Sequence, residues 1–126
     1  MAGFITANAL QRIGGVLGAV AIAAGAYGSH GLPSRLKRLE FSTEEVDRNK
    51  AVWATAASYH LLHSAVLLGS PLFAAPHITG PAILVGMLLF SGSCYAVAFT
   101  GDRSVGKLAP VGGMLMIAGW ASIALL

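Results

Sequence analysis

Charge is scarce in this sequence. Only 10% of its 126 residues are Asp, Glu, Lys or Arg, whereas 56% are hydrophobic. A typical soluble domain has about 25% charged residues, so this chain cannot cover a water-exposed surface and is not expected to be soluble. Residues 51–101 contain no charged side chain at all. The composition predicts a membrane protein that forms a single domain.

The side-chain sets that carry common catalytic chemistry are also missing. Cys94 is the only cysteine, which excludes an internal disulfide and a Cys-x-x-Cys motif. The long apolar stretches contain no carboxylate, and the chain has no phosphate-binding glycine loop. These absences argue against a hydrolase, a kinase or a proton-coupled drug transporter. We therefore expect a non-enzymatic protein with no resident cofactor and no metal.

The sequence contains four long apolar stretches. A bilayer core of about 30 Å needs about 20 apolar residues in a helix. The stretches that come close to this length are residues 9–29, 51–70, 78–100 and 108–126. Three prolines and Gly80, between residues 71 and 81, divide the long uncharged run in two. We predict an all-α membrane protein, a bundle of four transmembrane helices over residues 1–126.

Basic residues lie almost entirely on one side of the predicted membrane. The connections on that side hold Arg35, Lys37, Arg38, Arg48, Lys50, Arg103 and Lys107, and the other side holds only Arg12. Loops on the cytoplasmic side carry such an excess of Lys and Arg. The excess predicts both termini on the outer side, in the periplasm or the intermembrane space. It also accounts for the net charge of +3 without a nucleic-acid partner.

A charged segment connects the first two predicted helices. Ser42 and Glu45 have the spacing of a capping box, so the second helix is predicted to begin near Thr43. Before them, leucines alternate with Arg35, Lys37 and Arg38. The alternation is typical of a short amphipathic segment on the inner interface, where the basic side chains contact anionic lipid headgroups. A plain interfacial connector is the alternative.

Small residues are frequent along the apolar stretches. Transmembrane helices associate through small residues, because these let two backbones approach closely. The residues we assign to helix packing or docking are Gly14, Gly18, Gly25, Gly112 and Gly113. Small residues surround the first helix on all sides, so we expect it to be central. Pro110 is predicted to open the last helix, where its missing N–H costs nothing.

Three histidines lie in or beside the predicted spans. His60 and His63 are three residues apart and are predicted to share a face with Ser64, while Tyr59 lies four residues before His63. Ionisable residues inside a membrane are costly to bury and deserve a functional hypothesis. This face, together with His30, is a candidate site for a lipid or a quinone.

Other roles for these histidines stay open. His30 and His60 are a candidate pair of haem ligands, although their depths differ, and the histidines with Cys94 are a weak candidate for a metal site. The simplest interpretation is that the imidazoles are neutral and hydrogen-bonded across helices, to Ser91, Ser93, Tyr95 or a backbone carbonyl.

Several motifs resemble one known family, over nearly the whole chain and in order. The motifs are GAYGSHG at 25–31, YHLLHS at 59–64, LFSGS at 89–93 and LAPVGG at 108–113, followed by Gly119 and Trp120. Together they are similar to the transmembrane protein 256 family, which includes bacterial inner-membrane proteins with domain of unknown function 423. The resemblance implies a small polytopic protein without an established activity. It also implies a mitochondrial inner membrane for a eukaryotic member and the bacterial inner membrane otherwise.

These observations lead to two functional hypotheses. The first is an accessory or structural subunit, docked on a larger, respiratory-type complex of the inner membrane or assembled as a homo-oligomer. The second is a membrane protein that binds a lipid or a quinone at the face of His60 and His63. Membrane lipids are expected partners in both cases, and a bound phospholipid is compatible with either.

Overall fold

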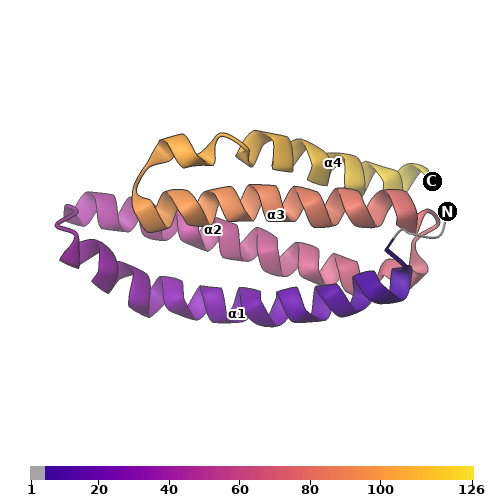
Figure 1. Cartoon of the computed structure of the whole chain (residues 1–126), viewed down its shortest axis with the longest axis horizontal. Coiled ribbons are helices and arrows are strands. Elements are labelled where there is room, and N and C mark those ends of the chain that lie inside the picture. Colours follow the sequence, from indigo (N-terminus) through magenta and orange to yellow (C-terminus); the bar gives the residue numbers. More distant parts are fainter. Residues whose placement is uncertain (1–4) are drawn as a thin grey trace.

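The structure is a computed structural model that describes residues 5–126. It has four long helices: α1 (Ala7–Arg38), α2 (Thr43–Leu68), α3 (Pro76–Thr100) and α4 (Ala109–Leu125). Two short 3-10 helices, η1 (Ser70–Leu72) and η2 (Arg103–Gly106), lie in the connections that precede α3 and α4. Figure 1 shows the four long helices side by side along one axis. The predicted all-α fold class is confirmed.

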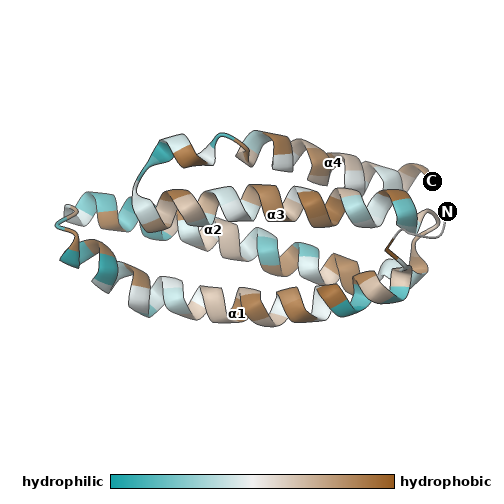
Figure 2. Cartoon of the chain, in the orientation of Figure 1, coloured by the Kyte–Doolittle hydropathy of each residue, from teal (hydrophilic) through white to brown (hydrophobic). Residues whose placement is uncertain are grey.

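Helices α1, α2 and α3 are long and apolar enough to cross a membrane, and so is the segment Arg103–Leu125, which is made of η2 and α4. Figure 2 shows hydrophilic residues gathered at one end of the bundle, around the α1–α2 turn and η2. Twelve of the thirteen charged residues lie in the segments 35–50 and 102–107 at this end, which we name the charged end. The start of α1 and the end of α4 lie together at the opposite end (Figure 1), which we name the terminal end.

The helices begin and end where local chemistry favours it. At the start of α2, the Glu45 N–H donates to Ser42 Oγ (3.2 Å) and the Ser42 N–H donates to Glu45 Oε2 (2.8 Å). Prolines stand in the first turns of α3 and α4, where the N–H has no partner in the helix. Gly101 ends α3 with φ at 73°, a left-handed conformation that suits glycine. The predicted capping box and the opening of the last helix at Pro110 are confirmed.

The four helices form two antiparallel hairpins, α1–α2 and α3–α4, that meet along α2 and α3. Helix α1 packs mainly against α2 and has only a slight contact with α3. The prediction of a central first helix is therefore wrong. Small residues permit close neighbours on every side of a helix, but they do not require them. The outward face of α1 includes Gly15, where nothing lies within 4 Å of an added Cβ.

The amphipathic segment before the α1–α2 turn differs from the prediction in one respect. It is not a separate connector, because α1 continues as one helix to Arg38 and includes Pro33. Figure 1 shows that α1 is bent near the charged end, as helices often are at a proline. The segment is amphipathic, since Leu32 and Leu36 are fully buried. They pack with Val46 of α2 in the core cluster of the charged end.

Within each hairpin, a glycine lets the two helices approach each other closely. A Cβ on Gly14 would lie 2.8 Å from the Ser64 carbonyl oxygen, and a Cβ on Gly86 would lie 2.9 Å from the Gly112 carbonyl oxygen. Both glycines therefore allow direct contact between two helix backbones. In the α1–α2 hairpin, Gly28 faces the ring of Trp53, whose Nε1–H donates to the Ala24 carbonyl (2.7 Å).

Candidate functional site

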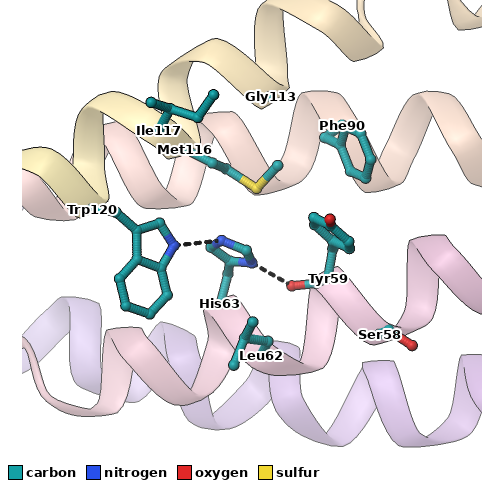
Figure 3. A pocket seen from close by; sticks show the side chains of 9 residues that line it. All are labelled: Ser58, Tyr59, Leu62, His63, Phe90, Gly113, Met116, Ile117 and Trp120. Atoms are coloured by element: carbon teal, nitrogen blue, oxygen red, sulfur yellow. Dashed lines mark hydrogen bonds between the residues drawn. The ribbon is translucent and has the colours of Figure 1, made fainter.

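A groove lies between α2 and α4, with α3 at its floor. Its volume is about 470 Å³, within the usual range of small-molecule sites. Figure 3 shows the side chains that line it, from Tyr59 and His63 on α2 across Phe90 on α3 to Met116 and Trp120 on α4. The remaining lining residues are Ser58, Leu62, Gly113 and Ile117. We name this cavity the aromatic groove.

His63 has hydrogen bonds at both ring nitrogens. Its Nδ1 lies 2.7 Å from the carbonyl oxygen of Tyr59, and its Nε2 lies 3.0 Å from Nε1 of Trp120. A carbonyl only accepts and an indole N–H only donates, so Nδ1 carries the proton and Nε2 is the acceptor. Figure 3 shows both bonds. This arrangement fits a neutral imidazole, because a second proton at Nε2 would oppose the indole N–H.

Aromatic rings make up much of the groove wall. The Tyr59 ring is stacked on His63, with centroids 5.9 Å apart, and it contacts Phe90 at 4.8 Å. Trp120 meets the edge of His63 at 6.0 Å. Met116 is almost fully buried behind these rings, where its sulfur-containing side chain can adapt to an irregular space. The groove therefore presents flat apolar surfaces and little polar surface.

His60 lies in a different environment from His63. It is 6% exposed, and its Nδ1 is 2.9 Å from the Tyr95 hydroxyl. It lines a smaller cavity of about 250 Å³ between α1 and α3, together with Leu17 and Met87. Ser64 is also turned away from the aromatic groove, since its hydroxyl donates to the His60 carbonyl (2.7 Å). The two histidines therefore share the buried face of α2 with Ser64, but they line different cavities.

Within residues 5–126, the Nε2 atom of His60 is buried without a hydrogen-bond partner. The predicted cross-helix bond of a histidine is confirmed for His60 and Tyr95. Another predicted partner, Ser91, instead donates to the Ala56 carbonyl (2.8 Å).

His30 is exposed on α1 and lies far from the other two histidines. The Gly28–Trp53 and Gly14–Leu67 contacts set the register of α1 against α2. In that register His60 is level with residue 21, nine residues from His30, which corresponds to about 13 Å along the helix. This separation does not suit two axial haem ligands. Among residues 5–126, no three His, Cys, Asp or Glu side chains are grouped to hold a metal ion.

The glycines chosen from the sequence have different surroundings. Gly14 and Gly112 lie in tight helix contacts, while an added Cβ on Gly18 would have ordinary contact with Ser64 at 3.7 Å. Gly113 borders the aromatic groove, and an added Cβ there would meet only Phe90, at 3.9 Å. At Gly25, no atom of the described residues 5–126 lies within 4 Å of an added Cβ. Neighbouring glycines in one motif thus have distinct roles.

The basic residues chosen as lipid contacts also differ from one another. Arg35 is engaged with the protein, because its Nε donates to the Phe99 carbonyl (3.2 Å) and its guanidinium lies 3.7 Å from the Phe99 ring centroid. Lys37 and Arg38 are exposed at the charged end.

The sequence prediction missed six residues that line the groove: Ser58, Leu62, Phe90, Met116, Ile117 and Trp120. Trp120 lies towards the end of a predicted span, a position that is typical of an interfacial anchor. Its spacing from Gly113 and Met116 places all three on one face of α4, a signal that a helical projection could have found. The position of that face opposite His63 depends on how α4 packs against α3.

Comparison with known proteins identifies the family. A family of proteins of unknown function, DUF423, matches residues 24–113. The chain belongs to the DUF423 family. A UPF0382 membrane protein of Schizosaccharomyces pombe is 30% identical over 122 residues, which cover 90% of this chain and 97% of the relative. A UPF0382 membrane protein of Staphylococcus saprophyticus is 31% identical over 113 residues, with 86% and 87% covered.

A third DUF423 relative, the UPF0382 membrane protein YwdK of Bacillus subtilis, is 30% identical over 118 residues, with 88% and 89% covered. No solved structure matches the chain. With its four apolar helices, this DUF423 chain is a multi-pass membrane protein from a family of small, uncharacterised membrane proteins. The matched region includes Tyr59, His63 and Phe90, whereas Met116 and Trp120 lie beyond its end.

Proposed function

We propose that this DUF423 protein is a non-enzymatic membrane protein that binds a membrane-dissolved molecule, a lipid or a quinone, in the aromatic groove. The observation that carries the proposal is a cavity of about 470 Å³ lined by the rings of Tyr59, Phe90 and Trp120. These rings offer flat apolar surfaces on which a ligand dissolved in the membrane can pack.

The chemistry of the groove favours binding over reaction. Both nitrogens of His63 are used by Tyr59 and Trp120, so the imidazole has no free position for proton transfer. Recognition therefore depends on shape and ring contact. Aromatic rings prefer offset or edge contacts with other rings, at centroid distances of about 4.5–7 Å. A quinoid ring or the kinked chain of a lipid suits these walls.

The test uses the purified protein in nanodiscs of dioleoyl phosphatidylcholine. A decyl-substituted benzoquinone is one probe, and phosphatidylcholine with brominated acyl chains is the other, because both quench tryptophan fluorescence on contact. The same titration with Trp120→Phe isolates the signal of Trp120 from that of Trp53, the other tryptophan. We expect saturable quenching of Trp120 by the probe of the correct class.

A matched pair of glycine variants supplies the control. Gly113→Leu places a side chain in the groove with room around its Cβ, whereas Gly25→Leu adds the same side chain where nothing lies within 4 Å. Gly113→Leu should weaken binding about tenfold or more, a loss of about 1.4 kcal/mol, and Gly25→Leu should leave it unchanged. Unsaturable quenching by both probes, or native affinity in Gly113→Leu, would contradict the proposal.

A second candidate function is the accessory subunit of a larger complex in a mitochondrial or bacterial inner membrane. The observation that favours it is the outward face of α1, where Gly15 and Gly25 have open space beside them and Val16 is 66% exposed. Such a surface lets another helix approach closely. A native gel of gently solubilised source membranes tests this role. Co-migration with a large complex supports it, and migration as a free monomer opposes it.

A further inference from the structure

A second crevice lies near the charged end, away from the aromatic groove. Its volume is about 210 Å³, and its walls come from α2, α3, η2 and the start of α4. The lining residues are Val52, Cys94, Val97, Arg103, Gly106 and Ala109. All except Arg103 are apolar or weakly polar. We name this cavity the Arg103 crevice.

The local fold fixes the segment that carries Arg103. The Asp102 carboxylate accepts hydrogen bonds from the Ser104 N–H (2.9 Å) and the Ser104 hydroxyl (2.7 Å). These bonds, with a smaller contribution from Lys107, hold the pKa of Asp102 below its usual value. The carboxylate is therefore charged and is occupied by its own turn. Arg103, the next residue, is exposed at the wall of the crevice.

The surroundings of the crevice favour an anion. Seven of the eight basic residues and all five acidic residues lie at the charged end, so this end has a net charge of +2. Arg48 lies four residues before Val52, and it therefore stands on the same face of α2, one turn closer to the end. Basic pockets between transmembrane helices on the cytoplasmic side are suited to the headgroups of anionic lipids.

We propose that the Arg103 crevice binds one anionic phospholipid from the leaflet at the charged end. The Arg103 guanidinium pairs with the phosphate, since its fork of N–H donors matches phosphate oxygens. An acyl chain extends along the apolar floor formed by Val97, Val52 and Ala109. Charge complementarity at the mouth and an apolar floor below it fit this amphipathic ligand better than a free anion. This site is independent of the aromatic groove, which lies between other parts of α2 and α4.

The single cysteine gives a direct readout of the site. Cys94 is half-buried and lines the crevice, so a bound acyl chain shields its thiol from N-ethylmaleimide. The rate of alkylation of the intact protein is followed by mass spectrometry, in detergent micelles that contain phosphatidylglycerol, cardiolipin, phosphatidylcholine or sn-glycerol 3-phosphate. We expect the two anionic lipids to slow alkylation at least about fivefold, and the neutral lipid and the free phosphate to have little effect.

Two charge variants complete the test. Arg103→Gln should abolish the protection by anionic lipids, whereas Lys50→Gln removes the same charge from an exposed position at the same end and should preserve it. Protection by phosphatidylcholine equal to that by phosphatidylglycerol would overturn the proposal, because it would indicate a simple apolar crevice. An equal loss of protection in Lys50→Gln would overturn it too, because surface charge alone would then be the cause.

Native mass spectrometry provides a second measurement that does not rely on the reactivity of Cys94. The native protein should retain one anionic phospholipid more strongly than phosphatidylcholine, and Arg103→Gln should lose this preference. The same preference in both proteins would contradict a site at Arg103. If Arg103→Gln loses this preference but its Trp120 fluorescence is still quenched by the quinone or lipid probe, the Arg103 crevice and the aromatic groove are separate sites.

Discussion

At the scale of single residues, hydrogen bonding decides what each buried histidine can do. His63 has a partner at both nitrogens, whereas His60 has a partner within residues 5–126 at Nδ1 only. The sequence places the two residues about 60° apart around α2, at 100° per residue. It does not tell on which sides of α2 the neighbouring helices lie. A pair that looks like one face in a helical projection is therefore divided between two cavities.

The His63–Trp120 bond should contribute measurably to stability. Trp120→Phe keeps an aromatic ring but leaves Nε2 of His63 without its donor. We expect the free energy of unfolding to fall by about 1 kcal/mol, near the value of a single hydrogen bond in a membrane protein. Unfolding in sodium dodecyl sulfate, followed by circular dichroism, measures the change.

A double-mutant cycle supplies the control for this bond. His63→Asn retains a donor for the Tyr59 carbonyl near the position of Nδ1 and lacks the Nε2 acceptor. Trp120→Phe should therefore cost little when it is made in the His63→Asn background. Equal costs in both backgrounds would mean that the tryptophan contributes by packing alone.

At the scale of helices, the sequence predicts the elements better than their neighbours. Hydropathy and the Ser42 capping box predict four helices and the start of α2 because both signals act within one segment. The continuation of α1 through Pro33 was missed, since it depends on the packing of Leu32 and Leu36 against Val46. The peripheral position of α1 was missed for a similar reason. Its small residues are compatible with either position, and only the contacts between helices distinguish them.

The α3–α4 contact should respond very differently to two adjacent substitutions. An added Cβ on Gly112 would lie 2.6 Å from the Gly86 carbonyl oxygen, whereas Gly113 has its nearest neighbour at 3.9 Å. Gly112→Leu should destabilise the protein by about 1–3 kcal/mol or more through overpacking, while Gly113→Leu should stay near the native value. Thermal unfolding of the two purified variants tests this. Similar melting temperatures would show that α4 can move away from α3 without cost.

The start of α2 should depend on pH. Hydrogen bonds from the backbone and side chain of Ser42, and to a lesser extent the charge of Arg48, hold the pKa of Glu45 below the ordinary value of 4.5. A carboxylate with a lowered pKa in the folded state stabilises it above the ordinary value. That contribution is lost as the pH falls through the folded pKa. We therefore expect the protection factor for hydrogen exchange, which corrects the observed rate for the intrinsic rate at each pH, to fall at the first turn of α2 below pH 4.5. In Glu45→Ala the protection factor should show no such fall.

At the scale of the whole molecule, charge predicts an orientation. Basic residues at the charged end should place it in the cytoplasm or the matrix, with the terminal end outside. Ser34 is exposed near the charged end and Leu72 is 90% exposed near the terminal end. In a Cys94→Ala background, single cysteines at these positions should react with a membrane-impermeant maleimide from opposite sides. Labelling of both from the same side would contradict the four-span topology.

The division into two hairpins has a consequence for the aromatic groove. Each hairpin has its own glycine contact, at Gly14 in one and at Gly86 and Gly112 in the other, while α2 and α3 form the seam between them. Tyr59 and His63 belong to the first hairpin, and Phe90, Met116 and Trp120 belong to the second. A molecule bound in the groove would contact both hairpins and would stabilise the interface between them. The ligand would then be part of the architecture, and the amount of folded protein in a membrane would follow the abundance of that ligand.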